Sequence, residues 1–166
     1  MHSQETKGFK EIEMHVKWIV KSPLPLAMAT LLISAPIAAS SSQNENARRA
    51  NLAFAEGAAI GVSPMTPSEM AQCSAYWDRW KYIVDSSNIP QFNEALRTEL
   101  SSNNAKKAAA RWLKLSKKAL RRRSGNLDEL AEILGESNEH ADAAYANWVN
   151  DEMGTAYELP RTLGSC

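Results

Sequence analysis

Histidine and cysteine are scarce in this sequence, which has three histidines and two cysteines among 166 residues. It contains no C-x-x-C-H motif, so covalently attached haem is excluded. Di-metal carboxylate bundles need two Glu-x-x-His repeats, whereas His140 is the only histidine after the N-terminal region. The sequence therefore predicts neither a metal centre nor a bound cofactor.

Signatures of common enzyme classes are also missing. There is no G-x-S-x-G, no H-E-x-x-H and no glycine-rich phosphate loop. Carboxylate pairs such as Asp78 and Asp85 are present, but such pairs can be named in almost any helical protein. We therefore expect a protein that is not an enzyme.

The sequence has no excess of either charge, with 19 basic and 19 acidic side chains. Its 44% of hydrophobic and 23% of charged residues are typical of a globular protein, and its length suits one domain. Net charge therefore predicts no partner. The distribution of the charges along the chain is more informative.

The N-terminal region has the pattern of an export signal. Lys17 and Lys21 precede an apolar segment, Leu24–Ala39, which ends in small residues and is followed by three serines. This segment contains two prolines and is marginal for crossing a bilayer core of about 30 Å. We expect a cleaved signal peptide over residues 1–39, with Met14 as an alternative start. The mature protein is then periplasmic or secreted, without a transmembrane segment.

The two cysteines, Cys73 and Cys166, both lie in the part expected to be exported. An even number of cysteines in an oxidising compartment favours one intramolecular disulfide. Two free thiols or an intermolecular bond are the alternatives. The bond would tie an irregular C-terminal tail, residues 155–166, to an early helix.

Apolar residues recur at helical spacing, and no segment alternates as a β-strand does. The fold class expected is all-α: a small antiparallel bundle of about five helices in one domain, residues 47–166, after a polar flexible leader, residues 40–46. The sequence Thr66-Pro67-Ser68-Glu69 predicts a capping box at the start of the second helix. The expected helices cover residues 45–60, 66–84, 89–101, 105–122 and 126–153.

Two helix boundaries can be tested by the angular position of the apolar residues. On one straight helix, Ala105 would lie about 220° from Phe92, so the chain should turn near Asn103 and Asn104. The apolar residues of 126–153 share one narrow arc, which favours a single long helix. A kink or break at Gly135 remains the alternative, and Gly154 is the expected stop.

The fourth expected helix is strongly basic. It has nine cations and no acid, and an apolar side formed by alanine, tryptophan and leucine. A basic amphipathic helix can bind an anionic lipid surface, lipopolysaccharide or an acidic protein, whereas export makes nucleic acid a poor candidate. The alternative is a solvated face, paired at its flanks with the acidic residues of the next helix. The candidate binding residues are Lys106, Lys107, Arg111, Lys114, Lys117, Lys118, Arg121 and Arg122.

Aromatic residues at helical spacing predict one core cluster. Trp77, next to Asp78 and Arg79, is the exception, because an exposed tryptophan beside charges can bind a partner or a sugar.

A ligand-holding bundle is the alternative function: noncovalent haem on His140 with a methionine (Met65, Met70 or Met153), or an apolar small molecule. It predicts a cavity among Trp80, Trp112, Tyr145 and Trp148. The cluster members expected are Tyr76, Trp80, Trp112, Tyr145 and Trp148.

Overall fold

The structure is a computed structural model that describes residues 37–123, 127–150 and 155–166. Within these ranges it contains six α-helices and one short 3-10 helix, without a β-strand. The predicted all-α helical bundle is therefore confirmed. The expected signal peptide lies almost wholly outside the described residues.

The first helix, α1, covers Ile37–Ala59 and begins earlier than expected. Residues 40–46, expected as a flexible polar leader, are helical instead. Ala38 and Ala39 and the glutamine and glutamate that follow favour a helix, whereas the three serines and two asparagines of this stretch do not. The helix ends just before Gly61, as predicted, and this glycine has a positive φ of 70°.

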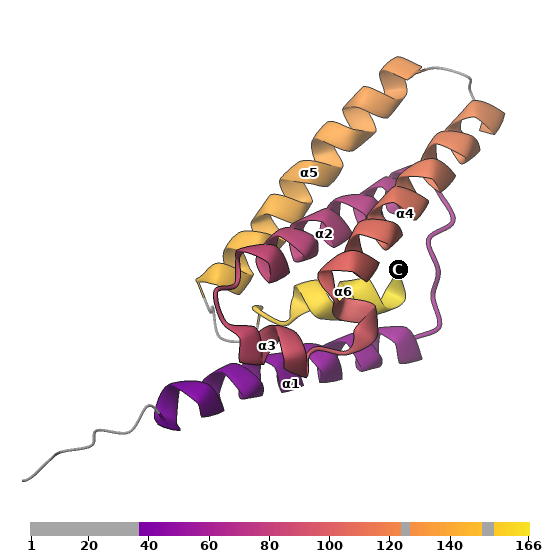
Figure 1. Ribbon diagram of the computed structural model, residues 1–166. Helices are drawn as coiled ribbons and strands as arrows, with labels where there is room; N and C mark the ends of the chain where they lie inside the picture. The colour runs from indigo at the N-terminus through magenta and orange to yellow at the C-terminus, as the bar shows by residue number, and fades with distance from the viewer. Residues whose placement is uncertain (1–36, 124–126, 151–154) are drawn as a thin grey trace, which may run out of the picture. The chain divides into compact units, whose positions relative to one another are not determined.

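The second helix, α2, covers Pro67–Ser86 and begins with the predicted capping box. The backbone N–H of Glu69 donates to the Thr66 hydroxyl at 3.2 Å, and the Glu69 carboxylate accepts from the Thr66 N–H at 2.9 Å. Figure 1 shows this helix in the middle of the bundle, where it packs against both long helices that follow it. Its buried side includes Cys73, Trp77, Trp80, Ile83 and Val84.

The expected third helix is interrupted. A short α3, Pro90–Ala95, is followed by a single 3-10 turn, Thr98–Leu100. Asn51 of α1 explains the break: its amide group donates to the carbonyl of Ala95 at 2.9 Å, and its amide oxygen accepts from the N–H of Arg97 at 2.8 Å. A residue distant in sequence thus takes backbone groups that a continuing helix would use.

The two long helices that form the far part of the bundle are α4, Ser102–Arg123, and α5, Leu127–Val149. The turn predicted at Asn103 and Asn104 is present but lies earlier, because both asparagines are already inside α4. Helix α5 runs without a break through Gly135, so a single helix is correct as far as residue 149. Its expected end and Gly154 lie outside the described residues.

The C-terminal tail was expected to be irregular, but it contains a sixth helix, α6, Glu158–Ser165. Leu159 and Leu163 are one turn apart and both buried, so packing against α1 and α2 stabilises a helix that is too short to form alone. Cys166 lies at disulfide-bonding distance from Cys73, with 5.7 Å between their Cα atoms. The predicted pairing of the two cysteines is therefore supported by their positions.

The aromatic core centres on Trp80, which is fully buried. Its ring centroid lies 5.2 Å from that of Trp148 on α5 and 6.5 Å from that of Phe92 on α3. Its indole N–H donates to the carbonyl of Leu100 at 2.8 Å. The 3-10 turn and α5 are thereby fixed to the middle of α2.

Candidate functional site: the basic face of α4

Helix α4 is rich in residues that favour helices, and its three C-terminal arginines suit the negative end of the helix dipole. Its buried side packs on α2. Two serine hydroxyls fix this contact: Ser74 donates to the carbonyl of Ala109 at 2.9 Å, and Ser116 donates to the carbonyl of Pro67 at 2.7 Å. The buried residues are Ala105, Ala109, Trp112, Ser116 and Leu120.

The opposite side of α4 carries the cations that the sequence singled out, and all of them are exposed. At about 100° per residue these eight side chains share an arc of about 160° that contains no acid. Within the described part of the chain, none of them has a carboxylate within ion-pair distance. We call this set the basic face: Lys106, Lys107, Arg111, Lys114, Lys117, Lys118, Arg121 and Arg122.

Two members of the basic face interact locally with the bundle. The guanidinium of Arg111 lies 5.8 Å from the ring centroid of Trp112. Lys106 helps to lower the pKa of Asp85, although hydrogen bonds from Lys81 and Ser102 have the larger effect on that carboxyl. The remaining cations project into solvent.

Most of the apolar side of α4 is buried inside the bundle, and this limits what the helix can do at a lipid surface. A helix that inserts into a membrane interface must expose its apolar face, whereas Trp112 and Leu120 are buried. The lysine and arginine head groups are therefore the main contacts available, together with Ala110 and the half-buried Leu113, which line an open groove of about 690 Å³ among the cations. Among the described residues no helix is long and apolar enough to cross a membrane.

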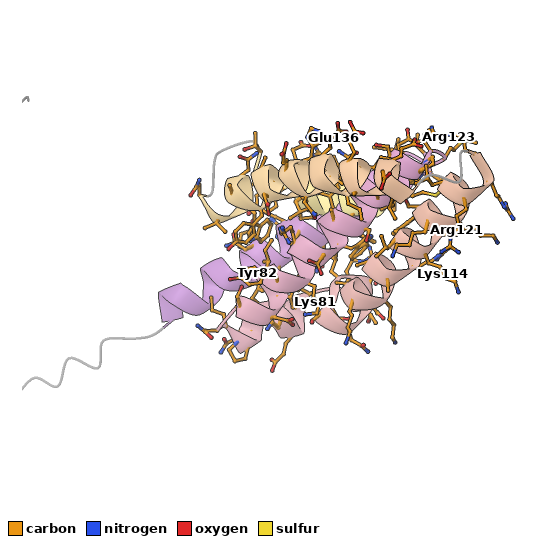
Figure 2. All side chains as sticks on the ribbon, turned by 90° about the horizontal axis from the view of Figure 1, so that it is seen from above. Lys81, Tyr82, Lys114, Arg121, Arg123 and Glu136 are labelled. Atoms are coloured by element: carbon orange, nitrogen blue, oxygen red, sulfur yellow. A yellow bond between two sulfur atoms is a disulfide. The ribbon has the colours of Figure 1, made fainter. Side chains whose placement is uncertain are left out.

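Acidic residues gather on the outer side of α5, not between the two long helices. The side chains of Glu132, Glu136 and Glu139 are exposed. Helices α4 and α5 each pack on α2 and touch one another little. Figure 2 shows Glu136 on the side of α5 that is turned away from α4. The alternative expectation was that acidic residues of α5 pair with the flanks of α4. Among the described residues one such ion pair is found, Arg123 with Glu129, where α4 ends and α5 begins.

Trp77 is not the exposed aromatic contact that its charged neighbours suggested. Only 5% of its surface is exposed, and its ring meets Phe54 of α1 edge-on at 6.2 Å. The indole N–H of Trp77 is buried without a hydrogen-bond partner. Its neighbour Arg79 instead forms an ion pair with Asp142 of α5.

The residues considered for haem binding do not converge on an enclosed site. His140 is exposed on α5, and Met65 is 83% exposed in the segment between α1 and α2. Met70 is half-buried on α2 and packs against the core. Met153 lies outside the described residues. No group of three or more potential metal ligands occurs in the described ranges.

A groove of about 240 Å³ lies where the C-terminal ends of α2 and α5 meet. Tyr145 and Trp148 line it, as expected for a ligand-holding site, whereas Trp80 is buried beneath and Trp112 lies elsewhere on α4. Sequence reasoning missed the polar part of the lining, since Asn46 of α1 and Ser86 and Ser87 of α2 carry no recognisable motif.

No protein family model, curated protein or solved structure matches this chain. The functional interpretation therefore rests on the geometry of its own residues.

Proposed function

We propose that the protein is a non-enzymatic interaction module whose basic face binds an anionic surface of the cell envelope. The observation that carries this proposal is the division of α4 into a side anchored on α2 and a side with eight exposed cations. The anchored side holds the cations on a rigid helix. Phosphate groups of anionic phospholipids or lipopolysaccharide suit such a row, and each cation near the surface contributes about 1 kcal/mol.

Because the large apolar residues Trp112 and Leu120 of α4 are buried, we expect binding to be electrostatic and peripheral. Attraction between exposed charges is screened over about 10 Å at 0.1 M salt. We therefore expect binding to vesicles that contain phosphatidylglycerol, release at high salt, and no binding to vesicles of phosphatidylcholine. Sedimentation of the vesicles with the protein measures each of these.

The matched variants reverse three cations on α4 or three elsewhere. Reversal of Lys114, Lys118 and Arg121 to Glu should abolish sedimentation with the vesicles. The control reverses Arg48, Lys81 and Arg97 to Glu, which changes the net charge equally but leaves the basic face intact. Equal loss in both variants, or binding that resists high salt, would contradict the proposal. Binding to acidic proteins but not to vesicles would assign the same face to a protein partner.

We further propose that the chain is exported to an oxidising compartment, such as a bacterial periplasm. The apolar segment after Lys21 supports this, as does the placement of Cys73 beside Cys166. The intact mass of the protein purified from its own cells tests it. We expect the mass of residues from about 40 to 166, less two hydrogens for a disulfide. A full-length product with two free thiols would overturn export.

A second candidate function is the binding of a small aromatic or apolar molecule in the groove beside Trp148. The aromatic lining of the groove favours an aromatic or apolar ligand. Its volume of 240 Å³ is below the range of about 300–1,000 Å³ that is usual for drug-sized ligands. A single-ring compound therefore fits better than haem. Titration with phenol should shift the NMR signals of Tyr145 and Trp148 and leave those of Trp112 unchanged; unchanged signals at all three sites would exclude it.

A further inference from the structure

Two exposed charge triplets with the same spacing lie on the two long helices. In each, the second residue is four positions and the third seven positions after the first, so each triplet follows one side of its helix over about 10 Å. Both lie within an arc of about 60° on the helix surface. The basic triplet is Lys114, Lys118 and Arg121 on α4, and the acidic triplet is Glu132, Glu136 and Glu139 on α5.

Neither triplet is neutralised within the described molecule. All six side chains are exposed, and none has an oppositely charged partner within ion-pair distance in the described ranges. The acids on either side of this triplet along α5 differ, because Asp142 pairs with Arg79 and Glu129 pairs with Arg123. The unpaired charge is therefore concentrated in the middle of the helix.

The fold prevents the two triplets from meeting in one molecule. Both helices pack on α2, and their outer sides point in different directions. Figure 2 shows Lys114 and Arg121 on the outer side of α4 and Glu136 on the side of α5 away from it. Each triplet is therefore open to another molecule, and the two are not on a common surface.

We propose that α4 binds a second copy of this chain. The basic triplet of one molecule docks against the acidic triplet on α5 of the other. Equal spacing allows three opposite charges to face one another at once along two parallel or antiparallel helices. Because the two triplets lie on different sides, the contact is heterologous, and each copy offers α4 to one neighbour and α5 to another. Such contacts produce a ring or an open chain of molecules.

This inference goes beyond the proposed function and does not rest on it. It has a consequence for that function, because association covers part of the basic face. Exposed ion pairs are individually weak and are screened by salt, so the association forms at high protein concentration and low ionic strength. An anionic surface then competes with the second copy for α4.

Analytical ultracentrifugation of the full chain at about 20 mM and about 300 mM salt tests the association. At low salt we expect the average mass to rise with concentration past that of a dimer, and at high salt a monomer. Reversal of Glu132, Glu136 and Glu139 to Lys should weaken association by about tenfold or more. Reversal of Lys114, Lys118 and Arg121 to Glu should do the same.

Mixing the two reversed variants should restore assemblies, because the reversed α4 of one then faces the reversed α5 of the other. The control reverses Glu56, Glu94 and Glu99 to Lys, which gives the charge of the α5 variant with the triplets intact. This control should still self-associate. The α4 variant keeps its acidic triplet but has lost its basic one, so it should join the control's assemblies only at one end and shorten them. A monomer under all conditions, association that persists at high salt, or equal loss in the control overturns the inference. The α5 variant retains the basic face, so its vesicle binding separates this inference from the proposed function.

Discussion

Gly57 of α1 and Gly164 of α6 bring two helix backbones into direct contact. A Cβ atom built on Gly57 would lie 3.2 Å from the Cα of Gly164, and one built on Gly164 would lie 2.6 Å from the backbone nitrogen of Ala58. No side chain fits between these helices. The C-terminal helix is therefore held by close backbone packing as well as by the cysteine pair.

The first prediction concerns this close approach. Gly164→Ala should push α6 away from α1 and lower the free energy of unfolding by about 1–3 kcal/mol, as overpacking typically does. Gly135→Ala on α5 is the control, because its Cβ would have no neighbour within 4 Å. That variant should gain about 0.5–1 kcal/mol from the better helix propensity of alanine. Urea denaturation of both proteins measures the difference, and a neutral Gly164→Ala would show that α6 is loosely docked.

The second prediction concerns the cysteines, which are 93 residues apart in sequence. A cross-link that closes a loop of this length reduces the entropy of the unfolded chain and typically stabilises a protein by about 2–5 kcal/mol. Reductant should therefore lower the Tm of the oxidised protein. The double variant Cys73→Ser and Cys166→Ser should have the Tm of the reduced protein and should not respond to reductant. A Tm that is unchanged by reductant would show that the two thiols are not bonded.

The third prediction compares two buried tryptophans of α2. The indole N–H of Trp80 donates to Leu100, whereas that of Trp77 has no partner. Trp80→Phe should therefore be more destabilising than Trp77→Phe by about 1–3 kcal/mol, the cost of leaving a buried hydrogen-bonding group unpaired. Each variant loses similar apolar volume, so the difference reports the hydrogen bond. Thermal denaturation measures it, and equal losses would contradict the role of Leu100.

The fourth prediction concerns stability at acid pH. The hydrogen bond from Arg79 holds the pKa of Asp142 below its ordinary value of 3.8. A carboxyl whose pKa is lowered by folding contributes stability above its unfolded pKa and loses it as the pH falls through the folded pKa. Asp142→Asn should therefore flatten the decline of Tm below about pH 4. NMR titration of Asp142 should give a midpoint under 3.8, and a midpoint at or above it would show that the link between α2 and α5 is absent in solution.

Some features of the fold could be predicted from the sequence because they depend on neighbouring residues. The capping box at Thr66 and Glu69 and the amphipathic division of α4 are of this kind. The periodicity of apolar and charged residues fixes which side of a helix faces the core, and the basic face followed from it residue by residue. The pairing of Cys73 with Cys166 was favoured by their even number together with the expected export, and the structure places them at disulfide distance.

Other features depend on contacts between distant segments. Asn51 breaks the third helix at Ala95, and packing on α1 and α2 gives α6 a helical form. Trp77 is buried because α1 places Phe54 over it, so its charged neighbours in sequence were a poor guide. The groove beside Trp148 likewise combines residues of separate helices, and no local pattern marks its polar part.

The sequence by itself determined that this chain forms helices, where α2 begins, and that one helix carries cations on a single side. Those properties follow from interactions within a few residues along the chain. Only the tertiary structure decided that the apolar side of α4 is used inside the bundle and that the basic and acidic triplets point apart. The physical reason is that both outcomes depend on how α4 and α5 pack on α2. Such long-range packing cannot be predicted from the local spacing of residues.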